Sequence, residues 1–262
     1  MRILRLILLG VLAYVVAMVA FFPAAPVVDR IRPQLGAVAL EGVSGKLYSG
    51  KVNTVRSTDD LLPLEFSNVA WRLSPSSLLK GGAGAVISFD GYGGGGEGNV
   101  TRRWNGDIAV SDFKFNASAK ELEPLLPVPV ASFSGRLNGE FARITLQNNL
   151  LTALEGSLSW SDAVLATAAF GPQLSASLGK IDINVAPEGD ESHVALVAAA
   201  GGDVAIDGKV SFARNGDYST DLVLTPASSA PPQLLNVLKR IGRPDAQGQY
   251  RIKQSGNVNR MM

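Results

Sequence analysis

Residue types that perform acid–base, nucleophilic or metal chemistry are sparse in this chain. His193 is the only histidine, and cysteine is absent. A lone histidine without thiols provides no convincing zinc or copper ligand set and only a weak candidate base, and no disulfide can form. His193 stands in GDESHVAL, where a turn enters a strand, a place at which solvated histidines are common. We therefore interpret His193 as structural, and we expect no metal and no cofactor.

A glycine cluster is the next candidate, because the backbone N–H groups of glycine-rich loops can cradle phosphate. Gly91, Gly93–Gly96 and Gly98 stand together in DGYGGGGEG. A phosphate loop continues into Gly-Lys-Ser/Thr and a helix, whereas Glu97 and Asn99 occur here and the next segment alternates like a strand. An acidic side chain would also repel phosphate. The cluster predicts a flexible hairpin loop.

The other polar residues do not form a catalytic pattern. GVSGK around Ser44 has Lys46 where a nucleophile elbow needs glycine. Neighbouring carboxylates stand in turn-like stretches, and in a strand they would point to opposite faces. Basic pairs such as Arg102-Arg103 lack the broad aromatic-laced face of a nucleic-acid site. The chain carries 24 basic and 23 acidic residues, so no strong field draws it to nucleic acid. The sequence predicts a protein that is not an enzyme.

The N-terminus has the pattern of a membrane anchor. Residues 6–22, LILLGVLAYVVAMVAFF, are 17 uncharged residues, and a membrane-spanning helix needs roughly 17–25. Arg2 and Arg5 favour a cytoplasmic N-terminus with the rest translocated. A cleaved signal peptide is the alternative, although AFFPAAPVV is a poor cleavage site. We predict a cytoplasmic N-terminus at 1–5, a signal-anchor at 6–28, a linker at 29–36 and a periplasmic β-rich domain at 37–262.

The body has the alternation of β-strands. Apolar and polar residues alternate in short runs through residues 37–258, bounded by Gly, Asn, Asp or Pro. Short helical turns are expected at 26–35, 74–82 and 120–127. The strongest helix signal is at 229–242, with Pro232 near its start and Gly242 at its end. The fold class is therefore mainly β: an N-terminal transmembrane helix followed by a curved antiparallel sheet with few short helices.

The chain also contains an apparent internal repeat. VSGKLYSGKV at 43–52 is echoed by FSGRLNGEFA at 133–142, and each is followed by a strand that ends in tryptophan, Trp71 or Trp160. A period near 90 residues is too long for a solenoid. It favours a duplicated meander with half-repeats at 37–130 and 131–228, followed by a helix and a strand at 229–258.

Glycines and small apolar residues give the remaining indication of how the strands pack. Runs such as GAVISF, ALVAAA and VLATAAF carry small side chains on both faces. Strands of this kind are buried on both faces or line a groove that receives something apolar. Glycines in LEGVSGKLYSG mark hairpin corners and close approach of strands. The residues to which we assign a structural or interaction role are Gly45, Gly50, Trp71, Pro75, Trp160 and Gly248.

The order of several motifs resembles the type II secretion system protein N family. The leader is followed by LEGVSGKLYSGKV, with Tyr48 where the family usually has tryptophan. The segment LEFSNVAWRLSPSSLLKGG matches the family's Trp-Arg-Leu-x-Pro-x-x-Leu-Leu-x-Gly at Trp71, Pro75 and Gly81 among others. LEGSLSWSDAVL and IGRPDAQGQYRIKQSGNV are similar to two further family elements.

This resemblance implies a non-catalytic, single-pass protein of the bacterial inner membrane. Its periplasmic body would support the export of folded proteins across the outer membrane, with other inner-membrane and periplasmic secretion components as partners. The body also looks like the lipid-handling AsmA type, so a periplasmic carrier of lipid or another hydrophobic ligand is the alternative function. A periplasmic hydrolase is disfavoured by the scarcity of acid–base groups.

Overall fold

A computed structural model describes residues 21–34, 36, 38–57, 63–79, 81–125, 131–147, 150–167, 174–189 and 192–257, together with residues 7, 10, 11 and 14. Most of them lie in one sheet. The strands are β1 (Val38–Glu41), β2 (Ser44–Gly45), β3 (Ser49–Ser57), β4 (Glu65–Ser74), β5 (Gly82–Gly91), β6 (Gly94–Arg103), β7 (Ile108–Ser118), β8 (Ala131–Gln147), β9 (Leu150–Thr167), β10 (Leu174–Glu188), β11 (Ser192–Ala200), β12 (Val204–Ala213), β13 (Asp217–Pro226) and β14 (Tyr250–Asn257). The helices are α2 (Ala24–Ile31), α3 (Pro75–Leu79) and α4 (Pro232–Ile241), and η1 (Arg32–Gln34) and η2 (Glu123–Leu125) are single 3₁₀ turns.

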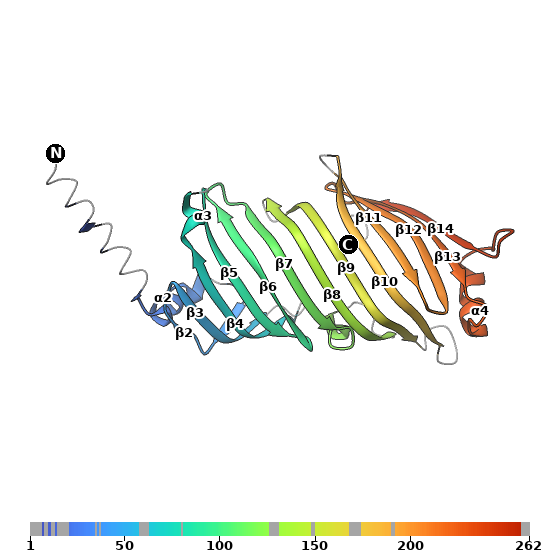
Figure 1. Ribbon diagram of the computed structural model, residues 1–262, viewed down its shortest axis with the longest axis horizontal. Helices are drawn as coiled ribbons and strands as arrows, with labels where there is room; N and C mark the ends of the chain where they lie inside the picture. Colours follow the sequence, from blue (N-terminus) through green and yellow to red (C-terminus); the bar gives the residue numbers. More distant parts are fainter. Residues whose placement is uncertain are drawn as a thin grey trace.

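The sheet is an antiparallel meander. From β3 to β13 every strand pairs with the strands before and after it in sequence, and β14 pairs with β13. At the first edge β1 pairs with β3, and β2 adds a short pairing to β3. Figure 1 shows the strands side by side in one long layer, with α3 at one end of β4 and β5 and with α4 beside the last strands. The prediction of a mainly β, antiparallel fold is confirmed.

Register and alternation divide the sheet into two chemically different faces. On one face, a row of residues that pair directly from strand to strand consists of apolar residues and glycines from β5 to β14. Its members are Phe89, Gly96, Phe115, Gly139, Leu158, Ile183, Val197, Gly208, Leu222 and Ile252. A row on the opposite face is mostly polar, and its members are Ser88, Glu97, Lys114, Glu140, Ser157, Asn184, Leu196, Lys209, Asp221 and Lys253. The period of two therefore separates an apolar face from a polar face from β5 to β14.

The core is thickest at the C-terminal end of the sheet. Leu234 and Leu238 of α4 pack on Ala176, Val204 and Tyr250, which come from β10, β12 and β14. A second small cluster joins Ala163, Ile181 and Ala199 of β9, β10 and β11. Over β5–β9 the main contacts of each strand are with its two neighbours. The apolar face is thus covered by a helix at one end and more open in the middle.

Two local predictions need correction or limits, and a third is confirmed. The glycine cluster is not a flexible loop, because the turn is only Tyr92-Gly93 and the glycines from Gly94 onward lie in β6. The helical turn expected at 120–127 is reduced to η2, and residues 126–130 lie outside the described part of the chain. The helix expected at 229–242 is confirmed as α4.

The N-terminal segment is described only in part. Within the predicted signal-anchor at 6–28, the structure describes residues 7, 10, 11, 14 and 21–28, and the other positions lie outside the described residues. Helix α2 and η1 occupy most of the predicted linker. Within the described residues, none of the helices combines the length and the apolar character needed to traverse a bilayer.

The two halves of the apparent repeat differ in local structure. Residues 43–52 form the β2–β3 hairpin, whereas residues 133–142 lie inside the single long strand β8. The duplicated meander therefore stays a prediction.

Candidate functional site

The candidate site is the apolar face over β4–β9, where aromatic rings form a ladder across the strands. Phe66 of β4 contacts Phe89 of β5 with ring centroids 4.8 Å apart, and Phe89 stacks on Phe113 of β7 at 6.3 Å. Phe115 and Phe141 of β7 and β8 stack almost parallel at 6.3 Å. These rings are only partly buried. Aromatic neighbours at such distances attract each other beyond simple area burial.

Glycines on adjacent strands provide the space that the rings occupy. A Cβ added to Gly96 would lie 2.7 Å from Phe89 Cζ, and one added to Gly139 would overlap the ring of Phe115. Each of these glycines is the direct cross-strand partner of that phenylalanine. The rings therefore pack directly against the glycine backbone. They supply the packing contacts that glycine, which has no side chain, cannot make.

A small hollow lies within this ladder. It has a volume of about 210 Å³, and its lining is formed by Ile87, Phe89, Gly98, Val100, Val110, Phe113 and Ile144. None of these described lining residues has a titratable side chain. Such a surface can exclude water and contact apolar groups, but it cannot transfer protons.

Three of the predicted site residues come together at the first strands. Gly45 has φ +89° at the β2–β3 corner and pairs with Gly50. The ring of Trp71 covers Gly50, and its Nε1–H donates a hydrogen bond to the carbonyl oxygen of Leu47 at 3.0 Å. Trp71 is partly buried. Gly45 therefore permits the tight β2–β3 corner, and Gly50 permits the close approach of the Trp71 ring.

The other three predicted site residues lie apart from this group. Trp160 of β9 donates its Nε1–H to the carbonyl oxygen of Ser134 at 2.9 Å. Pro75 is the first residue of α3, and Gly248 has φ +79° in the turn before β14. The six residues therefore do not form one site.

His193 is structural but not solvated, which corrects the expected surface position. It is 4% exposed and stacks on Phe212 with centroids 5.4 Å apart. The backbone N–H of Leu154 donates to His193 Nε2 at 2.9 Å and thereby joins β9 to β11 across β10. Burial lowers the pKa of His193, and the positive charge of Arg214 lowers it further.

We expect this contact to make the protein less stable in acid. The accepting Nε2 must be unprotonated, and the folded-state pKa lies below the unfolded value of about 6.5. The contribution is complete above that value and is lost as the pH falls through the folded-state pKa. Urea unfolding at pH 7.5 and pH 5 should show the loss, and His193→Gln should reduce it. An unchanged pH slope in His193→Gln would contradict this assignment.

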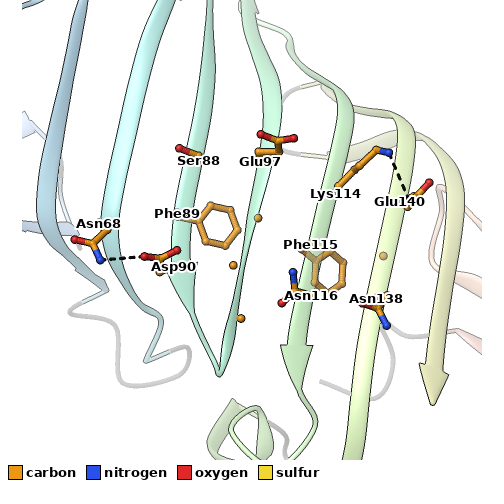
Figure 2. A pocket seen from close by; sticks show the side chains of 14 residues that line it. Asn68, Ser88, Phe89, Asp90, Glu97, Lys114, Phe115, Asn116, Asn138 and Glu140 are labelled. Carbon is orange, nitrogen blue, oxygen red and sulfur yellow. Dashed lines mark hydrogen bonds and ion pairs between the residues drawn. The ribbon is translucent and has the colours of Figure 1, made fainter.

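The polar face carries exposed ion pairs and hydrogen bonds. Figure 2 shows Asn68 Nδ2 bonded to Asp90 Oδ2 at 2.9 Å and Lys114 Nζ paired with Glu140 Oε1 at 3.5 Å. At the C-terminal end, hydrogen bonds from Arg251 hold the pKa of Asp221 below its usual value. Among the described residues no group of histidine, aspartate and glutamate could hold a metal ion. Exposed pairs of this kind keep a face hydrated and contribute little stability.

Comparison with known proteins decides the family. The family model "Type II secretion system (T2SS), protein N" matches residues 36–253. The type II secretion system protein N of Aeromonas hydrophila is 28% identical over 255 residues, covering 95% of this chain and 96% of that protein. The chain belongs to the type II secretion system protein N family. The protein of the same name from Vibrio cholerae serotype O1 is 25% identical over 232 residues, covering 84% of each chain. No solved structure matches significantly.

Protein N membership gives the chain a role in type II secretion, a form of protein transport, as a non-enzymatic component. The ring ladder of this protein N chain was missed from the sequence. The sequence does contain a signal for it. The segment GGGEG at 94–98 has glycines spaced two apart, and the segment DFKF has phenylalanines spaced two apart, Phe113 and Phe115. That pattern becomes readable only once β6 and β7 are known to pair.

Proposed function

We propose that the chain is a single-pass protein of the bacterial inner membrane whose sheet stands in the periplasm as a scaffold of the type II secretion system. The family match over residues 36–253 carries this proposal. The uncharged stretch at 6–22, preceded by Arg2 and Arg5, supports a cytoplasmic N-terminus and a translocated body.

The scaffold would engage other secretion components through its last strand. In the described chain β14 pairs only with β13, so its outer edge can receive a further strand. The opposite edge is partly occupied, because Pro23 bridges to Lys46 and Arg32 donates to the carbonyl oxygen of Leu40 at 3.3 Å. A partner strand would therefore add at β14.

Protease added to spheroplasts tests the orientation. We expect the protease to cleave the polypeptide beyond residue 30 and also to cleave a control protein on the outer face of the membrane. A cytoplasmic marker protein should stay intact. A body that survives while the outer control is cut would overturn the proposal. Deleting the chain should also lower export of the secreted proteins, and the full-length gene should restore it.

The partly exposed apolar face favours a second candidate, a carrier of lipid or another hydrophobic ligand. Its aromatic hollow and its uniform row of apolar residues support contact with acyl chains. Native mass spectrometry of detergent-extracted protein separates the candidates, because a carrier retains bound lipid and a scaffold alone is released lipid-free.

A further inference from the structure

Three exposed apolar side chains of the body lie at one end of the strands. Trp104, in the β6–β7 turn, is 68% exposed, and Leu78 of α3 is 55% exposed. Leu151 at the start of β9 is also exposed. Strand register places these segments at the same end, because the start of β5 pairs with the end of β6, the start of β7 with the end of β8, and the end of β8 with the start of β9. Large apolar groups left in water at one end of a sheet indicate a contact surface.

The leader joins the body at this same end. The backbone N–H of Leu47 donates to the carbonyl oxygen of Phe22 at 2.8 Å. The next residue, Tyr48, accepts a hydrogen bond at 2.8 Å from Leu73, near the start of α3. Phe21 is 70% exposed, with Lys46 Nζ 4.5 Å from its ring centroid. The end of the apolar leader and the exposed tryptophan therefore lie at the same strand ends.

The charge at this end is basic. Arg102 and Arg103 directly precede Trp104, both are exposed, and neither has a carboxylate partner among the described residues. The turn's carboxylate, Asp107, instead accepts hydrogen bonds from Asn105 and Gln147. Tryptophan beside arginine suits the bilayer interface, where the ring lies at headgroup level and the guanidinium meets phosphate.

We propose that this end of the sheet docks on the surface of the membrane that anchors the chain. We call it the α3 rim and define it by Leu78, Arg102, Arg103, Trp104 and Leu151. Trp104 lies among the lipid headgroups, and the two arginines contact anionic lipid phosphates. The inference rests on the proposed anchored topology. It gives the anchored sheet a fixed orientation, with the strands of β5–β9 rising from the bilayer at their α3 end.

The absence of cysteine permits a clean test in the full-length protein. Trp104→Cys and, as control, Lys120→Cys are each labelled with an environment-sensitive fluorophore and reconstituted into phosphatidylethanolamine–phosphatidylglycerol vesicles. Lys120 is exposed beyond the other end of β7, roughly 30 Å away by strand rise. Lipids brominated on the acyl chains near the headgroups should quench the label at 104 at least about twofold more than the label at 120, with emission shifted to shorter wavelength.

Charge variants distinguish contact of the label with anionic lipid from burial of the label within the protein. In the Trp104→Cys background, Arg102→Gln with Arg103→Gln should reduce the quenching, and so should replacing phosphatidylglycerol by phosphatidylcholine. Equal quenching at 104 and 120 would overturn the proposal. If the quenching is equal but spheroplast proteolysis still cleaves the body, only the proposed membrane contact of the α3 rim is wrong. If the body also resists the protease, the proposed anchored topology is wrong as well.

Discussion

Replacing Gly179 by alanine should destabilise the protein by about 2–5 kcal/mol. Gly179 has φ +66° at the irregular β9–β10 register. An added Cβ would overlap the carbonyl oxygen of Ala200 and lie 2.6 Å from the backbone of both Gly201 and Gly202. These are backbone atoms of the turn after β11, so they cannot rotate away as a side chain would. The cost combines left-handed backbone strain of about 1–2 kcal/mol with overpacking of about 1–3 kcal/mol.

Gly189→Ala is the matched control. Gly189 has a similar φ of +76°, and nothing lies within 4 Å of its added Cβ. Its substitution should cost only the backbone strain, about 1–2 kcal/mol. Urea unfolding in detergent, followed by far-ultraviolet circular dichroism, measures both variants. Equal losses in the two would show that the crowding around Gly179 is relieved by movement of the turn.

The second large effect is expected for Trp71→Ala. Loss of a fully buried tryptophan typically costs about 3–5 kcal/mol, but Trp71 is only partly buried, so we expect about 2–3 kcal/mol. The loss has two sources: the ring no longer covers Gly50, and the hydrogen bond to Leu47 disappears. Both contacts hold the β2–β3 corner against β4. The free energy of unfolding from urea titration is the measurement.

Trp104→Ala serves as its control within the same end of the sheet. Trp104 is 68% exposed, so its removal should change the free energy of unfolding by less than about 0.5 kcal/mol. A loss below about 1 kcal/mol for Trp71→Ala, together with abolished secretion, would instead make Trp71 a contact residue for a partner.

Sequence patterns predicted the elements whose signals are local. Alternation identified strands because each has one apolar and one polar face. Pro232 near the start and Gly242 at the end identified α4 in the same way. The glycine cluster misled, because glycine inside a strand resembles a loop until the aromatic side chain that covers it is known.

The amino-acid sequence by itself determined the β class, the near absence of catalytic groups and the pattern of an apolar leader, because composition and short-period alternation are properties of neighbouring residues. Tertiary structure alone decided that Phe89 lies over Gly96, that His193 accepts a hydrogen bond from Leu154 some forty residues away, and that Leu78, Trp104 and Leu151 share one rim. These juxtapositions depend on strand register, and register is set by pairing between distant segments of the chain, which no local pattern specifies.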